Sequence, residues 1–399
     1  MKGITIHAQK TFTLGQNLVN VSSLMQVSFY LPEKYFPSEE WIQAWKENRP
    51  FPLEESGKAA AAHAWIYQTW ALLTEAGIKT SLISELPTTG LVLALSGTLD
   101  ESFRSSQLSS DFFLVDIVAD GLPHPAAHFH LVQNRAHAHR LPRSQFIPHW
   151  PQPALIPRAE NRKMLFEKIS FFGDPNNLAA ELFSFSWQQR LKKELALEFE
   201  IKRADRPLAE LAVGDEEQEA TAHRGGVYKD ILDDSSTGAT QLFAPTVELC
   251  KGSNQWHDYS NVDAVIAIRD FSRSRQLHKP ATKLYNAWLA GVPFIGGNDS
   301  AYRSDGRPGI DYLVAQSPKQ VLEHLRKLKE DTVFRTHLIQ NGIESGKKLC
   351  RSATLERWKS LIQETLPTLA FQWQKKSPSQ RACYLLAQRA VGWIDRKLR

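Results

Sequence analysis

A group of basic side chains between residues 269 and 283 is the part of this sequence best suited to chemistry. Arg269 directly follows an apolar segment, Lys283 opens the next predicted helix, and Lys279 lies between them. In an open α/β sheet, ligands bind at the loops that follow the carboxyl ends of the strands. Cations beside the free amides of a helix start form a site for an anion. The spacing therefore predicts a phosphate-binding loop; the alternative is a solvated basic loop.

Three more residues near this loop are candidates to contact the same ligand. Thr282 can cap the helix or touch a phosphate oxygen, and Asn286 lies one turn later on the same face. Asn286 can bond to a ribose or sugar hydroxyl, although a packing contact between helix and strand is an equal alternative. Gly173 follows an apolar segment at 168–172, so a ligand can approach its backbone without meeting a Cβ atom.

The N-terminal half contains candidate proton acceptors. His124 and Asp120 fall between two predicted strands, and His128 directly precedes the second. A neutral imidazole near its ordinary pKa can accept a proton at physiological pH, so His128, His124 and Asp120 are the candidate catalytic residues. The alternative for both histidines is an ordinary surface or partly buried position.

No metal site is expected from the sequence. The histidines lack carboxylate or cysteine neighbours at ligand spacing, and the adjacent pair Asp233 and Asp234 lies in a Ser/Thr/Gly context typical of a turn. The three cysteines, Cys250, Cys350 and Cys383, are too few and too far apart for a disulfide framework and fit a reducing compartment.

Length and composition indicate a soluble, cytoplasmic protein of two or three domains. The chain has 399 residues, of which 42% are hydrophobic, which is enough for sizeable cores. The net charge is only +5, so general nucleic-acid binding is not expected. We find neither a secretory signal nor an apolar run of about eighteen residues that could span a membrane.

The order of elements predicts an α/β protein. A helix is expected at 58–76, and the strand-like segments are 24–31, 79–83, 91–95, 112–118, 129–132 and 145–147, followed by 168–172, 197–202, 262–268, 292–295 and 312–315. Four prolines between Ile147 and Arg158 mark a domain boundary. The expected domains are therefore 1–150 and 151–366, with a helical tail at 367–399. Residues 204–255 have no sustained hydrophobic periodicity, which predicts a loop or an insertion.

The last predicted helix, 379–398, is amphipathic. Its apolar side has Cys383, Leu386, Ala387, Ala390, Trp393 and Ile394, and its polar side has Gln388, Arg389, Asp395, Arg396 and Arg399. We expect the apolar side to pack against the domains. The alternative is a peripheral membrane contact at the inner face, with the basic residues near anionic lipid.

Two short runs carry a resemblance to a known superfamily. Lys279-Pro280-Ala281-Thr282-Lys283 and the segment from Asn286 to Pro293 resemble the donor-site segment of GT-B glycosyltransferases, and the resemblance covers about residues 164–365. Many retaining members have two glutamates eight positions apart here, whereas this chain has His278 and Asn286. The usual carboxylate contact to the ribose is therefore absent or replaced by an amide.

The resemblance implies two Rossmann-like domains that face each other across a cleft, with a C-terminal helix crossing between them. It implies that domain 151–366 binds a nucleotide-diphosphate sugar and domain 1–150 binds the acceptor, which can be a sugar, a lipid-linked sugar or a small molecule. The expected activity is that of a metal-independent, hexosyltransferase-type enzyme without a cofactor. A nucleotide-sugar epimerase or hydrolase, and a catalytically inactive binding protein of the same fold, are the alternatives.

Overall fold

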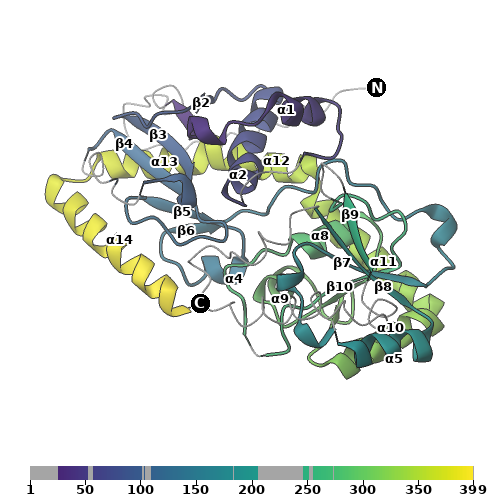
Figure 1. The fold of residues 1–399 in the computed structure, drawn as a ribbon. Coiled ribbons are helices and arrows are strands. Elements are labelled where there is room, and N and C mark those ends of the chain that lie inside the picture. The colour runs from purple at the N-terminus through teal and green to yellow at the C-terminus, as the bar shows by residue number, and fades with distance from the viewer. Residues whose placement is uncertain are drawn as a thin grey trace, which may run out of the picture.

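The structure is a computed structural model that describes residues 26–52, 57–100, 103, 109–182, 184–204, 246–250, 255–272 and 274–398. Two six-stranded sheets, each made of parallel strands only, occupy the two halves of the molecule (Figure 1). All carboxyl ends in a parallel sheet lie along one edge, and that edge is where the fold places ligands. The expected α/β architecture is confirmed.

The first sheet has the strand order β2-β1-β3-β4-β5-β6. Its strands are β1 (Val27–Tyr30), β2 (Ser81–Ile83), β3 (Gly90–Leu95), β4 (Phe112–Ile117), β5 (Phe129–Val132) and β6 (Ser144–Phe146). Helix α1 (Glu39–Lys46) lies between β1 and the long helix expected at 58–76. That helix consists of α2 (Gly57–Ala62), a π-helical turn at His63–Tyr67 and α3 (Gln68–Glu75), and the short helix α4 (Arg135–Ala138) follows β5.

The second sheet has the order β12-β11-β10-β7-β8-β9. Its strands are β7 (Lys168–Phe172), β8 (Glu198–Ala204), β9 (Thr246–Cys250), β10 (Ala264–Ala267), β11 (Phe294–Gly296) and β12 (Leu313–Val314). Its helices are α5 (Phe185–Leu195), α8 (Thr282–Leu289), α9 (Ser300–Asp305), α10 (Pro318–Glu330) and α11 (Thr332–Gly346). Strand β9 was not predicted, because it falls within residues 204–255, for which the sequence indicated a loop or insertion.

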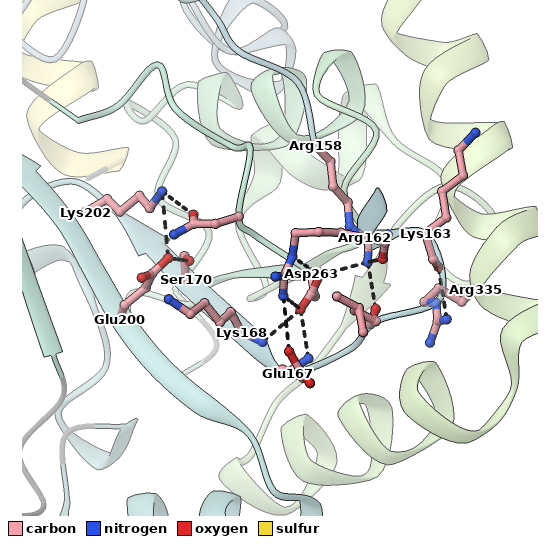
Figure 2. A network of polar contacts seen from close by, with 12 residues as sticks. Arg158, Arg162, Lys163, Glu167, Lys168, Ser170, Glu200, Lys202, Asp263 and Arg335 are labelled. Atoms are coloured by element: carbon pink, nitrogen blue, oxygen red, sulfur yellow. Dashed lines mark hydrogen bonds and ion pairs between the residues drawn. The ribbon is translucent and has the colours of Figure 1, made fainter. Parts of the chain in front are cut away.

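A buried carboxylate fixes the segment that joins the two sheets (Figure 2). Asp263, which directly precedes β10, is fully buried and accepts hydrogen bonds from the guanidinium groups of Arg158 and Arg162 at 2.6–3.0 Å. It also accepts from the backbone N–H groups of Glu167 and Lys168 at 2.8 and 2.9 Å. Two cations and two amides balance the single charge, so residues 158–168 are held against the amino edge of the second sheet.

The chain returns to the first sheet earlier than the expected position 367. One continuous helical segment makes the return; it consists of α12 (Arg351–Ser360), a π-helical turn at Leu361–Thr365 and α13 (Leu366–Gln374). Its residues Trp358 and Trp373 are buried in the first sheet's core. Pro367 lies in the first turn of α13. The π-helical turn changes the hydrogen-bond register just before it, at the point where proline lacks its donor.

The final helix, α14 (Pro378–Leu398), packs on the first sheet's half, but not through the expected side. Val391 is buried with Val118, Val132 and Leu141, and the buried Asp395 carboxylate pairs with the imidazole of His137. The predicted packing side is wrong, because Cys383, Leu386, Ala387, Ala390 and Trp393 are exposed. The pairing with His137 of α4 explains why Asp395, a charged residue of α14, is buried. The Ile394 side chain lies outside the described side chains.

Candidate functional site

The carboxyl edge of the second sheet brings together Gly173, after β7, and Lys283, in the first turn of α8. Gly173 has φ +124°, a conformation that favours glycine. A Cβ atom at this position would lie 3.4 Å from Cε and 3.5 Å from Nζ of Lys283. The end of the Lys283 side chain therefore lies directly against the backbone of Gly173.

Arg269 lies at the end of β10, also on this edge, and is held in place by two contacts. Its guanidinium donates to Oδ1 of Asn177 at 2.6 Å, and its Nε lies 3.4 Å from Oδ1 of Asp299. Asp299 directly precedes α9 and is buried, which raises its pKa to about 6 although the Arg269 charge acts in the opposite direction. The sequence singled out Arg269 but gave no weight to Asn177 as its partner.

Lys283 is the cation in this group with no carboxylate within ion-pair distance among the described residues. Its Nζ lies 5.4 Å from the centre of the Phe171 ring. Burial lowers the pKa of Lys283 to about 7, and the charges of Arg269 and Lys279 lower it further while Asp299 and Asp120 oppose them. A cation that the protein itself does not neutralise is a place for an anionic ligand.

Thr282 begins α8, but its side chain does not cap the helix. The residue before the helix is Ala281, which offers no side-chain acceptor to the first turn. The Thr282 Oγ1 atom is buried and has no hydrogen-bond partner among the described residues. The first amides of a helix also lack partners within it, so the hydroxyl and the helix start can both bond to a ligand oxygen.

Asn286, one turn further along α8, makes contacts within the protein. Its Oδ1 atom accepts the backbone N–H of Gln152 at 3.2 Å, and its side chain also hydrogen-bonds to the buried Tyr259. Gln152 belongs to the segment between the two sheets. The structure therefore places Asn286 as an anchor for that segment, in line with the packing alternative.

Lys279 meets Asp120 from the other half of the molecule. The Lys279 Nζ atom lies 3.1 Å from Oδ2 of Asp120, and Nε2 of Gln133 donates to the other carboxylate oxygen at 2.6 Å. Burial alone would raise the pKa of Asp120, but the charges of Lys279, Arg269 and His278 outweigh it and lower the pKa. Asp120 therefore brings a carboxylate of the first sheet to the cations of the second.

Three consecutive residues after β5 hold the two halves together here. Gln133 also donates to the carbonyl of His278 at 3.2 Å, and the Asn134 amide donates to the Lys279 carbonyl at 3.1 Å and to Ser300 Oγ at 2.9 Å. Arg135 pairs with Asp305 at 2.5 Å. Gln133 and Asn134 are buried. These contacts fix the loop that contains Lys279. They could not be predicted from local sequence pattern, because they join distant segments.

The two histidine candidates are not part of this group. His128 is fully buried between Phe113 and Trp373, and its Nδ1 atom accepts the Leu114 N–H at 2.9 Å. The ring of His124 is also buried: Nε2 bonds to the Asp100 carbonyl at 3.1 Å, and Nδ1 accepts the Ala126 N–H. Both rings contact backbone groups of their own half of the molecule.

Another histidine, His149, follows β6 and lies close enough to Asp120 for its pKa to respond to that charge. Burial lowers the His149 pKa, against the raising effects of a hydrogen bond to the Trp150 carbonyl and of Asp120. Nδ1 donates to that carbonyl at 2.8 Å, which leaves Nε2 as the basic nitrogen of a neutral ring. His149 was not among the candidates from the sequence; its position shortly after a predicted strand was the signal that could have identified it.

Metal ligands do not gather in the described part of the chain: no three His, Cys, Asp or Glu side chains there form a cluster that could hold an ion. Asp233 and Asp234, the acidic pair considered from the sequence, lie outside the described residues. The site that the structure does present is a set of cations and helix amides suited to an anion.

Comparison with known proteins identifies the architecture. No protein-family model and no curated protein matches this sequence. Among solved structures, sucrose-phosphate synthase from Thermosynechococcus elongatus is similar over 86% of this chain and 100% of its own, with TM-score 0.52 and 10% identity. HepE from Anabaena in complex with UDP-glucose is similar over 85% of this chain and 99% of its own, with TM-score 0.51 and 10% identity. The chain has the GT-B fold that its sequence resembled.

Proposed function

We propose that this protein is a glycosyltransferase that transfers a sugar from a nucleotide-diphosphate sugar to an acceptor hydroxyl. The observation that carries the proposal is the position of Lys283 at the carboxyl edge of the second sheet, beside Gly173 and near Arg269 and Lys279. A solvated basic loop would not hold a partly buried lysine with no carboxylate of the described residues at ion-pair distance. The similarity to HepE, which was solved with UDP-glucose, supports a nucleotide sugar as the anion.

The diphosphate is the part of the donor that these residues recognise. In a transfer, the bond between the sugar C1 and the diphosphate oxygen breaks, and negative charge develops on the leaving group. Lys283, Arg269 and Lys279 stabilise that charge together with the first amides of α8 and the Thr282 hydroxyl. Each charge-assisted hydrogen bond contributes about 1.5–3 kcal/mol. This set needs no metal ion, so we expect activity to survive chelation.

The acceptor hydroxyl must lose its proton as its oxygen bonds to C1. Asp120 pairs with Lys279, and His149 lies close enough to Asp120 for its pKa to respond to that charge. A neutral imidazole is the better proton acceptor near pH 7, because the lowered pKa of Asp120 makes its carboxylate a weak base. We therefore assign proton removal to His149, with Asp120 as a group that orients Lys279.

Binding without turnover is the second candidate function. Asn286 stands where many retaining relatives have a glutamate, and its amide oxygen already bonds to the backbone of Gln152. A protein in which the side chain at position 286 does not contact the donor can still bind the nucleotide without transferring the sugar. An epimerase or hydrolase of the same fold would convert the donor without any acceptor.

A ligand screen followed by a product assay tests the proposal. Calorimetry against UDP, GDP, ADP, CMP and TDP identifies the base, since binding to the native state also raises its melting temperature. The matching nucleotide sugars are then incubated with sugar, lipid-linked and small-molecule acceptors, with and without EDTA. A glycosylated acceptor formed in the presence of EDTA is the expected result.

Each other outcome of the assay has a defined meaning. Donor conversion without an acceptor indicates an epimerase or hydrolase, and binding without product across the panel indicates a binding protein. No binding of any nucleotide diphosphate contradicts the site itself. Activity that is lost with EDTA and restored by magnesium or manganese contradicts metal independence.

A further inference from the structure

The C-terminal helix α14 presents an apolar stripe to solvent. Leu386 and Trp393 are 62% and 64% exposed, and Cys383, Ala387 and Ala390 between and beside them are exposed as well. Spacings of three and four residues place these side chains on one face of the helix. Figure 1 shows α14 along the outer side of the first sheet's half. The opposite face is the one buried through Val391 and Asp395.

The charges around this stripe are almost all positive. From residue 375 to the end, the sequence has one acidic residue, Asp395, against seven basic residues: Lys375, Lys376, Arg381, Arg389, Arg396, Lys397 and Arg399. The Asp395 carboxylate is buried against His137, so it adds no negative charge to the exposed stripe. Near the end of the stripe, Lys397 Nζ lies 5.4 Å from the centre of the Trp393 ring.

We propose that α14 docks this protein on an anionic lipid bilayer, lying in the plane of the interface with the Leu386–Trp393 stripe toward the acyl chains. An apolar helix face bordered by lysine and arginine is the pattern of an interfacial helix. Tryptophan and lysine favour this depth, because each has an apolar body and a polar end. None of the described helices has the length and hydropathy required to cross a bilayer, so the contact is peripheral.

The charge distinguishes a membrane from a second copy of the chain. Two α14 helices packed stripe to stripe would bring two sets of cations together, with only the buried Asp395 of each to oppose them. Like charges at an interface are unfavourable, whereas anionic headgroups attract each basic residue. The proposal goes beyond the transferase function, and vesicle binding requires neither donor nor acceptor.

The test is co-sedimentation of the full chain with vesicles, without any nucleotide. One set is an equal mixture of phosphatidylglycerol and phosphatidylcholine, and the other is phosphatidylcholine alone. We expect binding to the anionic set that weakens with added salt, and at least about tenfold weaker binding to the neutral set. The double variant Leu386→Gln/Trp393→Gln should reduce partition into the anionic vesicles by about tenfold or more.

A matched control removes the same amount of exposed apolar surface elsewhere. Met164 and Val333 are 76% and 64% exposed and belong to the second sheet's half, so Met164→Gln/Val333→Gln should bind vesicles like the wild type. Both double variants should melt like the wild type, because all four side chains are exposed. A polarity-sensitive dye on Cys383, with the other two cysteines replaced by serine, should shift to the blue when anionic vesicles are added.

Three results would overturn the proposal. The first is no binding to anionic vesicles, and the second is equal binding by the Leu386→Gln/Trp393→Gln variant and its control. The third is a concentration-dependent dimer that this variant abolishes, in the absence of vesicle binding. That result would assign the stripe to a second copy of the chain.

Discussion

The ammonium group of Lys283 lies 3.5 Å from the point where Gly173 would have a Cβ atom. Gly173 follows β7 and Lys283 lies in the first turn of α8, so the two residues meet at the carboxyl edge of the second sheet. The sequence predicted each as a ligand contact. The structure adds that they are neighbours, so a change in the backbone at Gly173 should affect the anion site around Lys283.

Gly173→Ala is expected to lower both stability and nucleotide affinity. Alanine rarely adopts a φ of +124°, so forcing it there should cost on the order of 1–3 kcal/mol. The new methyl group would meet Lys283 only at ordinary van der Waals distance, so the effect on affinity comes through the strained backbone of the loop. Chemical denaturation and UDP calorimetry measure the two effects. Gly97→Ala, at a position with ordinary φ and open space, is the control; equal results for both variants would contradict this account.

Lys283→Met is expected to weaken binding of the nucleotide diphosphate without unfolding the chain. Methionine retains the apolar stem near Phe171 and removes the charge. Loss of one charge-assisted contact of about 1.5–3 kcal/mol corresponds to a roughly ten- to hundredfold loss of affinity. Lys347→Met removes an exposed charge that pairs with Glu344 and serves as the control. Unchanged affinity in Lys283→Met would remove Lys283 from the site.

The lowered pKa of Lys283 predicts that affinity falls as the pH rises. With a pKa of about 7, the free protein loses this charge above neutrality. A bound diphosphate favours the protonated form and raises the pKa, so binding takes up a proton between the two values. The dissociation constant should then rise by up to about tenfold per pH unit between about pH 7 and 9.

Above pH 7 the terminal phosphate, with a pKa of about 6, is almost fully ionised and adds little to this slope. Calorimetry in buffers of different ionisation enthalpy reports the proton uptake directly. The Lys283→Met variant should show a much flatter pH dependence. The same slope in the variant and the wild type would show that another group titrates.

The sequence was informative where local pattern determines structure. Strands β5 and β7 have the predicted bounds, because each is a short apolar run between turn residues. The basic loop was located for the same reason, since a strand, a loop and a helix start follow one another in the chain. What local pattern could not supply is the identity of long-range partners.

The long-range contacts explain the differences. His137 and Asp395 are 258 positions apart, and their pairing, together with the burial of Val391, explains why α14 buries a charged residue and leaves its apolar stripe exposed. Asn134 likewise bonds to residues that lie far along the chain, in the loop of Lys279 and at Ser300. A helical projection gives the faces of a helix, but it does not say which face meets the protein.

Asp120→Asn should tighten binding of the nucleotide diphosphate by a small factor. The carboxylate neutralises Lys279 in the free protein, and its removal leaves that cation for the ligand. The Asp120 side chain is partly exposed, so its pairing with Lys279 is worth roughly 0.2–1 kcal/mol, or about one- to fivefold in affinity. Asparagine can still accept the hydrogen bond from Gln133.

Glu344→Gln removes a carboxylate at a distant exposed position and is the control for charge alone. Calorimetry with UDP at low salt is the measurement. Weaker binding in Asp120→Asn would show that the carboxylate organises the loop of Lys279 more than it competes with the phosphate.

Asp263→Asn should destabilise the protein strongly while leaving the anion site unaltered. The buried carboxylate accepts hydrogen bonds from two arginines and two backbone amides. In the variant, the NH₂ group of asparagine is itself a donor, so it would face some of these N–H groups without an acceptor between them. Breaking a buried pair of this kind costs about 3–5 kcal/mol. Urea denaturation measures the loss, and Glu160→Gln, which breaks the exposed pair with Lys163, should change stability very little.

The pH dependence of this contribution follows from the pKa of Asp263. Burial would raise the pKa, but Arg162, the two amides and Arg158 outweigh it, so the folded value lies below the ordinary one. The stabilisation is therefore complete above the unfolded pKa of about 3.9 and is lost as the pH falls through the lower folded value. The stability gap between wild type and Asp263→Asn should be constant near neutrality and close in acid; a gap that does not change with pH would contradict a charged Asp263.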